Sequence, residues 1–396
     1  MRDRGNSSFL DLTIDRRGHI MTFEEGCPSG DSPKGSQKGS QYRMETRVIP
    51  IDREHLHSDQ LREAAQLLRD GELVAFPTET VYGLGGDALD PDASRRIYAA
   101  KGRPSDNPLI VHIADTDALP VLAKDIPESA WALAEKFWPG PMTIILRKKE
   151  IVPDATTGGL QTVAIRMPSD PVAAMLIRVS GVYIAAPSAN ASGRPSPTCA
   201  EHVYEDLQGR IPMILDGGSV PIGLESTIVD LTGDIPLVLR PGYITIEQLR
   251  EVLPTVEYDP AVVKRVKDET IVARAPGMRY RHYAPKGELT IFEGDLDKVV
   301  ARVQKEAEAK LAEGYRVAVL ASEETKDCYR GLTVRSVGDR EEEASVAAHL
   351  FATLREFDNM GAEYIFGESF PESGVGQAVM NRLMKAAGYR IVAVEE

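Results

Sequence analysis

Short apolar runs alternate along this chain with longer stretches that have helical spacing. Leu73–Phe76 is a continuous apolar run, and Leu109–Ile113 is apolar except for His112; both have the length expected for buried strands. Between them, Asp90-Pro91-Asp92 can open a helix, with proline in its first turn and acidic residues at its positive end. Residues 73–113 are therefore predicted to form a strand, a helix and a second strand.

Similar patterns flank this unit from residue 45 to about residue 250. Residues 58–71 have helical spacing, with Ser58 as a candidate N-cap and Gly71 at the end. A further helix is predicted over 127–137. Strands are predicted over 45–52, 144–146, 162–168, 183–186 and 226–230. These elements together predict an α/β domain over residues 45–250.

Residues 251–287 contain no long apolar run, so we expect a linker between two domains there. Regular alternation resumes at residue 288. Strands are predicted over 289–292, 316–320, 333–336, 364–366 and 390–394, and helices over 295–313, 341–357 and 375–387. This order predicts a small Rossmann-like parallel α/β domain over residues 288–396, without a P-loop or a G-x-G-x-x-G motif.

The length of 396 residues agrees with two domains. The first 43 residues include PSGDSPKGSQKGSQ, which has the composition of a disordered segment, and a start at Met44 is an alternative. Three scattered cysteines without a C-x-x-C pair disfavour a zinc site or a disulfide framework. No apolar run is long enough to span a membrane, and the N-terminus lacks a signal-peptide core. We therefore expect a cytoplasmic protein without a membrane partner.

The net charge of −14 restricts the function. A general nucleic-acid binder needs a basic face to neutralise phosphates, and an acidic chain does not suggest one. A local basic site for a small anion remains compatible with this charge.

Polar side chains cluster where the predicted strands end, which is a usual position for a small-molecule site. Thr78 and Thr80 follow the first strand, and the helix leads to Lys101 and Arg103. Considered alone, the Lys-Gly-Arg turn fits a solvated basic turn as well as it fits a binding site. A lone histidine such as His112 fits a structural role better than a role in binding. Arg and Lys beside hydroxyls suit a nucleoside triphosphate next to a small zwitterion.

Several segments in this order resemble the YrdC-like family of threonylcarbamoyl-AMP synthases. They are PTETVYGLG, KGRP, NPLIVHI, WPGPMTIIL, APSAN and SGRPSPT. Residues 288–396 resemble the C-terminal domain of the long form of that synthase. The resemblance implies a YrdC-like twisted mixed sheet with helices, followed by a small parallel domain. It also implies that the linker acts as a lid, with Arg279 and Arg281 adding charge over the phosphates.

The resemblance implies a nucleotidyltransferase that converts L-threonine, bicarbonate or CO2, and ATP into threonylcarbamoyl-AMP and pyrophosphate. Mg²⁺ is expected with the triphosphate, and no metal-binding residue is assigned. The product would pass to a tRNA threonylcarbamoyl-transfer complex, with at most a weak tRNA contact. The sequence contains neither a nucleophile elbow nor a metal-ligand cluster, so positioning and electrostatic stabilisation must carry the reaction.

The resemblance also assigns individual residues. The family's threonine site falls on Thr80, His112, Arg166, Ala186 and Ser226. Its ATP site falls on Arg103, Asn107, Thr162, Ser188, Ser196, Arg240 and Tyr283. Lys101 and Arg103 are the expected catalytic residues, because they lie in the basic turn that would face phosphate.

Two other classes of function remain open. A YrdC-like fold can present a concave surface to double-stranded RNA, although the acidic charge counts against that. A carbamoyltransferase of hydrogenase maturation contains a related domain, but that family also carries C-x-x-C zinc fingers and an acylphosphatase domain. Three scattered cysteines cannot supply such fingers.

Overall fold

The computed structural model describes residues 12–14, 20–22, 44–263, 274–276 and 282–395. Residues 1–42 and 43–396 form two separate compact units. In the first unit, β1 (Leu12–Ile14) pairs antiparallel with β2 (Ile20–Thr22). The rest of the extension expected to be disordered lies outside the described residues. All other described elements belong to the second unit.

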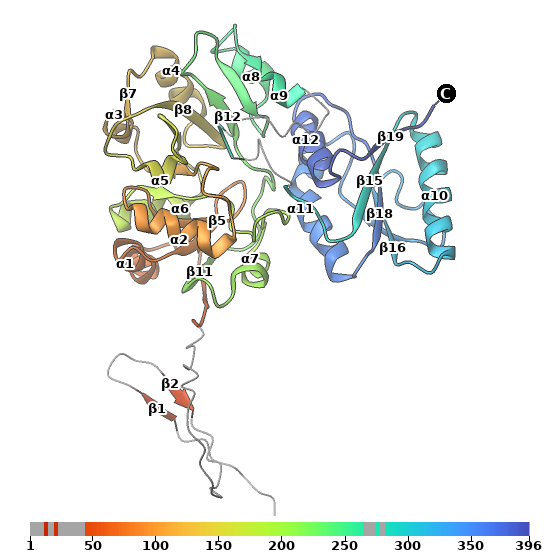
Figure 1. Ribbon diagram of the computed structural model, residues 1–396, viewed down its shortest axis with the longest axis horizontal. Helices are drawn as coiled ribbons and strands as arrows, with labels where there is room; N and C mark the ends of the chain where they lie inside the picture. Colours follow the sequence, from red (N-terminus) through yellow and green to blue (C-terminus); the bar gives the residue numbers. More distant parts are fainter. Residues whose placement is uncertain (1–11, 15–19, 23–43, 264–273, 277–281, 396) are drawn as a thin grey trace, which may run out of the picture. The chain divides into compact units, whose positions relative to one another are not determined.

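A mixed sheet of twelve strands forms the centre of the first domain (Figure 1). Its order is β14-β13-β12-β8-β9-β6-β10-β5-β4-β11-β3, and β7 pairs with β8. The strands are β3 (Arg47–Pro50), β4 (Val74–Phe76), β5 (Gly83–Asp87), β6 (Ile110–His112), β7 (Ala123–Lys124), β8 (Met142–Lys148), β9 (Thr162–Arg166), β10 (Ile184–Ala185), β11 (Met213–Asp216), β12 (Thr227–Asp230), β13 (Leu237–Arg240) and β14 (Glu257–Tyr258). Strand β9 is parallel to β6 and antiparallel to β8, which confirms the predicted mixed sheet.

Helices cover both faces of this sheet. Successive residues of a strand point to opposite faces, so each strand can contribute apolar side chains to the core on either side. Val74 and Phe76 contribute to one core with α1 and α6, whereas Ala75 contributes to another core with α2, α4, α7 and α8. The helices and 3-10 turns are η1 (Ser58–Leu61), α1 (Arg62–Arg69), α2 (Pro91–Lys101), η2 (Thr116–Ala118), α3 (Leu119–Leu122), α4 (Glu128–Phe137), α5 (Asp154–Thr157), α6 (Pro171–Ser180), α7 (Ala200–Leu207), α8 (Ile246–Arg250) and α9 (Pro260–Val263). The first domain is thus a sheet between two helical layers.

The helix boundaries show where local sequence signals succeed. In α2, Asp90 accepts a hydrogen bond from the backbone N–H of Asp92 at 2.8 Å, and Pro91 occupies the first turn as predicted. Gly102 ends this helix with a left-handed φ of 64°, a conformation that glycine adopts without steric cost. The prediction that Ser58 caps a helix is wrong. A 3-10 turn begins at Ser58 after the uncapped His57.

The large sheet continues past residue 250, where the linker was expected to begin. Strand β14 pairs parallel with β13. Leu253 and Val256 are buried in the largest core of the first domain. A two-residue strand has too little hydrophobic pattern to be recognised from sequence, and so residues 251–263 resembled a linker.

The second domain contains a five-stranded sheet in the order β17-β16-β18-β15-β19. Its elements are β15 (Glu288–Glu293), α10 (Leu296–Ala312), β16 (Val317–Ala321), β17 (Thr333–Ser336), α11 (Glu343–Asn359), β18 (Tyr364–Glu368), α12 (Gly376–Ala386) and β19 (Ile391–Ala393). Every neighbouring pair of strands is parallel. The predicted parallel α/β domain is therefore confirmed, with each predicted strand and helix present.

Helix α10 covers one face of this sheet, and α11 and α12 cover the other (Figure 1). The core beneath α11 and α12 also includes Val81, Leu224 and Tyr283, which precede the second domain in sequence. Hydrophobic packing thus joins α11 and α12 to Val81 and Leu224 of the first domain and to Tyr283 of the segment between the domains.

Candidate functional site

A polar cavity lies where several strands of the large sheet end. It has a volume of about 680 Å³, part of which is open to solvent. Strand pairing places His112 opposite both Arg166 and Ile184, so three strands contribute to one wall. The residues that line the cavity are Thr78, Thr80, Val81, Gly83, Lys101, Arg103, Ile110, His112, Arg166, Ala186, Pro187, Ser188, Asn190, Ser192, Gly193, Glu225, Ser226, Arg240, Pro276, His282 and Tyr283.

Arg166 forms the centre of one side of the cavity. Its Nη1 donates a hydrogen bond to Thr80 Oγ1 at 2.9 Å, and its Nη2 lies 2.7 Å from the Glu79 carboxylate. Its Nε has no hydrogen-bond acceptor among the described residues. Arg166 therefore combines a resident counter-ion with a remaining donor, which suits the binding of a small carboxylate.

His112 lies beside Arg166 and is almost completely buried. Burial first, and the neighbouring Arg166 second, lower the pKa of His112 to about 3. Its Nδ1 lies 3.1 Å from the carbonyl oxygen of Ile110. The imidazole is therefore neutral at physiological pH and adds hydrogen-bonding capacity without adding charge.

Arg240 and Ser226 form a second polar group in the cavity. Arg240 donates to Ser226 Oγ at 3.1 Å and to the Ser226 carbonyl oxygen at 3.0 Å. Ser226 Oγ also lies 2.8 Å from Thr143 Oγ1. Burial lowers the pKa of Arg240 to about 10, even though the Glu225 carboxylate opposes this effect. Arg240 remains a cation near neutral pH, held in a fixed position by the strand ends.

Lys101 and Arg103 emerge together from the end of α2. Lys101 is 3% exposed, and its Nζ donates to the carbonyl oxygens of Ser188 and Asn190. Burial, reinforced by Arg103, lowers the pKa of Lys101 well below its ordinary value, whereas Asp206 opposes the shift. Arg103 is half-buried and donates from Nε to the Asn107 carbonyl oxygen at 3.3 Å. The predicted basic turn is therefore part of the cavity wall.

The structure brings most of the predicted site residues to this cavity. Those that line it are Thr80, Lys101, Arg103, His112, Arg166, Ala186, Ser188, Ser226, Arg240 and Tyr283. Tyr283 is 4% exposed and stacks on Phe351 of α11, with 5.1 Å between ring centroids. Arg279 and Arg281, which were expected to lie over the phosphates, are outside the described residues.

Three predicted residues do not line the cavity. Thr162 begins β9, whereas Arg166 ends it, so the two lie roughly 13 Å apart at the usual rise per strand residue. Thr162 lines a separate hollow with Lys124 and Arg147. Ser196 is buried and donates to Glu225 at 2.5 Å, and Asn107 is buried beside Arg103.

Two buried carboxylates were missing from the sequence-based assignment. Glu79 pairs with Arg166, and Glu225 accepts a hydrogen bond at 2.8 Å from Arg382 Nε of α12. Each is next to an assigned residue, Thr80 or Ser226. This proximity was the only available signal, because the arginine partners are 87 and 157 residues away. The two carboxylates leave the cavity wall with an excess of cationic groups.

Within the described parts of the chain, no group of three or more His, Cys, Asp or Glu side chains could hold a metal ion. The same parts contain no helix that is long and apolar enough to cross a bilayer.

Comparisons with known proteins agree with this arrangement. A family model described as telomere recombination, of the Sua5, YciO and YrdC proteins, matches residues 66–242. A second model, the threonylcarbamoyl-AMP synthase C-terminal domain, matches residues 244–388. Together the two matches extend over most of the second unit.

Curated relatives and solved structures match most of the chain. The threonylcarbamoyl-AMP synthase of Pyrococcus abyssi is 50% identical over 88% of this chain and 100% of its own length. That of Bacillus subtilis is 50% identical over 84% and 94%, and that of Schizosaccharomyces pombe is 39% identical over 95% and 96%. The structure of P. abyssi Sua5 complexed with L-threonine has a TM-score of 0.84 and 48% identity, and the match covers 88% of this chain and 100% of that one. The chain belongs to the threonylcarbamoyl-AMP synthase family, in the long form that carries both domains.

Proposed function

We propose that this cavity makes threonylcarbamoyl-AMP from L-threonine, bicarbonate or CO2, and ATP, with release of pyrophosphate. The observation that carries the proposal is the convergence of four basic side chains with hydroxyls and a neutral imidazole in one cavity. These basic side chains are Lys101, Arg103, Arg166 and Arg240. On a chain with a net charge of −14, such a concentration of positive charge indicates an anionic ligand.

L-threonine is proposed to bind at the Arg166 end of the cavity. The substrate carboxylate would take the Nε donor of Arg166, while Glu79 and Thr80 hold the rest of the guanidinium. The L-threonine complex of the 48% identical P. abyssi protein supports this choice of substrate. Thr80 and Ser226 provide hydroxyls that can recognise the substrate hydroxyl.

ATP is proposed to bind toward Lys101, Arg103, Arg240 and the hydroxyl of Ser188. The neutral threonine amine adds to the carbon of CO2 and releases a proton to solvent, which leaves a carbamate anion. A carbamate oxygen then attacks the α-phosphorus, and the bond to the leaving pyrophosphate breaks. Fixed cations stabilise the charge that develops on the phosphate oxygens, so that no protein nucleophile is required.

Mg²⁺ is proposed to enter with ATP. Magnesium usually keeps several waters and binds substrate phosphates, with only one or two protein carboxylates. The Glu225 carboxylate lines the cavity but is held by Arg382 and Ser196. The phosphates and water would therefore provide most of the ligands for the ion, which would neutralise charge on the triphosphate.

The segment between the domains is proposed to cover the bound substrates. Pro276, His282 and Tyr283 line the cavity, and Arg240 Nη1 donates to the Pro276 carbonyl oxygen at 3.3 Å. Such a cover would exclude water from a labile carbamate and its adenylate. The product is then proposed to pass, in the cytoplasm, to a tRNA threonylcarbamoyl-transfer complex.

Incubation with ATP, labelled bicarbonate and single amino acids tests this function. We expect label in a threonylcarbamoyl adenylate and one pyrophosphate for each product formed. Valine has nearly the shape of threonine but lacks the hydroxyl, so a site that pairs this hydroxyl should reject it by orders of magnitude. Equal pyrophosphate release with valine would contradict the assignment of the threonine subsite. An absence of labelled adenylate with every amino acid would contradict the function.

A further inference from the structure

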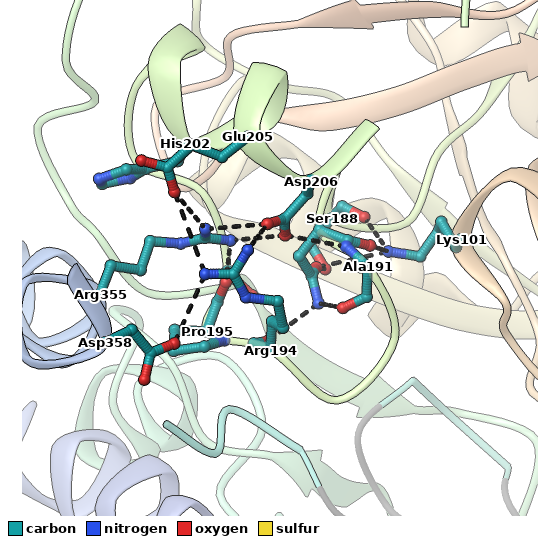
Figure 2. Close-up of polar contacts among 12 residues, drawn as sticks. Lys101, Ser188, Ala191, Arg194, Pro195, His202, Glu205, Asp206, Arg355 and Asp358 are labelled. Carbon is teal, nitrogen blue, oxygen red and sulfur yellow. Dashed lines mark hydrogen bonds and ion pairs between the residues drawn. The ribbon is translucent and has the colours of Figure 1, made fainter. Parts of the chain in front are cut away.

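Two arginines of the second domain are completely buried against polar groups of the first domain. Arg355 of α11 and Arg382 of α12 have no exposed surface. Arg382 donates to Glu225, which lines the cavity, and to the Pro241 carbonyl oxygen at 2.9 Å. Arg355 does not line the cavity, and its contacts lead to the loop behind Lys101 (Figure 2).

The guanidinium of Arg355 forms a two-point contact with Asp206 of α7. Nη2 donates to Oδ2 at 2.8 Å, and Nη1 donates to Oδ1 at 3.2 Å. Nη2 also donates to the carbonyl oxygen of Pro195 at 2.6 Å. Neither side chain of the pair is exposed, so the two charges compensate each other away from water.

Asp206 holds the loop that runs from Ser188 to Pro195. Its Oδ2 accepts a hydrogen bond from the Ala191 backbone N–H at 2.9 Å, and its Oδ1 accepts from Arg194 Nη1 (Figure 2). Asn190 Nδ2 donates to the carbonyl oxygens of Ala191 and Arg194, at 2.9 Å each. The carboxylate and the amide side chain therefore fix the same short segment.

The other side of this loop holds Lys101. The carbonyl oxygens of Ser188 and Asn190 accept from its Nζ, and the Ser192 backbone N–H donates to the Lys101 carbonyl oxygen at 2.9 Å. No carboxylate lies within hydrogen-bond distance of this ammonium among the described residues. The position of the loop consequently decides both where Lys101 points and where Ser188 presents its hydroxyl.

We infer that Arg355 is a positioning residue for the ATP side of the active site, and that it acts through Asp206 and the Ser188–Pro195 loop on Lys101. This inference rests on the proposed function and assigns the second domain a direct part in it. A residue of α11 thereby sets the geometry of a phosphate-binding group that it does not touch. The threonine subsite at Arg166 depends on other elements, β6 and β9, and on Glu79.

The charges around Lys101 make the role of this network measurable. Burial and Arg103 lower the pKa of Lys101; Asp206 raises it, Arg355 lowers it and Glu225 raises it. Removing the Asp206 charge should therefore lower the pKa of Lys101 further, and removing the Arg355 charge should raise it. In the pH profile of kcat/KM for ATP, Asp206→Asn should therefore move the alkaline limb to lower pH, and Arg355→Met should move it to higher pH. A general loss of structure would not shift the limb in opposite directions in the two variants.

The test compares Arg355→Met and Arg355→Lys with the unaltered full chain. Both variants should raise the KM for ATP, Arg355→Met by tenfold or more and Arg355→Lys by less, because lysine keeps the charge but loses the two-point contact. Threonine binding, measured by calorimetry without ATP, should change by less than twofold. Arg335→Met is the matched control. Arg335 of β17 forms an ion pair on the surface with Glu356, which follows Arg355 in α11.

A double variant completes the test. The double variant Asp206→Asn/Arg355→Met should have a KM for ATP no higher than that of the more impaired single variant, because the two residues act as a unit. An unchanged KM for ATP in folded Arg355→Met, or an equal loss of threonine and ATP binding, would overturn the inference. If Arg355→Met does not fold, the same two measurements on Arg355→Lys decide. A full chain that makes no threonylcarbamoyl adenylate would instead refute the proposed function.

Discussion

Replacing Glu225 by glutamine tests how strongly the buried ion pair stabilises the contact between the two domains. Glu225 accepts hydrogen bonds from Arg382 at 2.8 Å and Ser196 at 2.5 Å. Burial alone would raise the pKa of this carboxyl, but Arg382 first and Arg240 next lower it from 4.5 to about 2. The folded chain therefore binds the proton of Glu225 less tightly than the unfolded chain does.

This difference has a definite sign and size. A pKa that is lower in the folded state stabilises the fold above pH 4.5, and the contribution is lost as the pH falls from 4.5 toward 2. At about 1.4 kcal/mol per pKa unit, the ionised Glu225 contributes about 3 kcal/mol near pH 7. Glutamine resembles the protonated acid, so Glu225→Gln should be less stable by about 3 kcal/mol at pH 7, and the gap should narrow to about 1 kcal/mol at pH 3.

Urea unfolding of both proteins at pH 7, 4 and 3 measures this gap. Glu306→Gln is the control, because Glu306 pairs with Arg302 on the surface of α10, where such pairs contribute little. A gap that stays constant between pH 7 and pH 3 would refute the reasoning, since it would show that the charge of Glu225 is not its source.

Three further predictions concern activity. Arg103→Ala should lower kcat/KM for ATP by roughly 30- to 1000-fold, about 2–4 kcal/mol of lost transition-state stabilisation, and leave threonine binding intact; steady-state turnover near the wild-type value would contradict this. Removing divalent cations with EDTA should abolish pyrophosphate release and excess Mg²⁺ should restore it, whereas undiminished release would show that ATP reacts without the metal. Because burial and Arg166 lower the pKa of His112 to about 3, the pH profile of kcat/KM should contain no step near pH 6.5 that disappears in His112→Asn.

Local sequence signals indicated most of the helices and strands and the polar residues at the strand ends, whereas the family resemblance assigned those residues their roles. The unit from residue 73 to residue 113 could be predicted because apolar runs, a proline in the first helical turn and a terminal glycine act over a few residues. The same is true of the parallel second domain, whose strands and helices are long enough to show a period. The basic turn at Lys101 and the hydroxyl of Thr80 were found because each lies beside such a signal.

The partners of the polar side chains were decided only by the tertiary structure. Strand register places His112 opposite Arg166, and strand direction places Thr162 at the far end of the same strand. Arg355 meets Asp206 across 149 residues of sequence, and no periodic pattern marks either residue. Hydrophobic periodicity reports which face of an element is buried, because burial follows the local repeat. The partner of a buried charge depends on how whole elements pack, and that information lies in the fold rather than in any short segment of the chain.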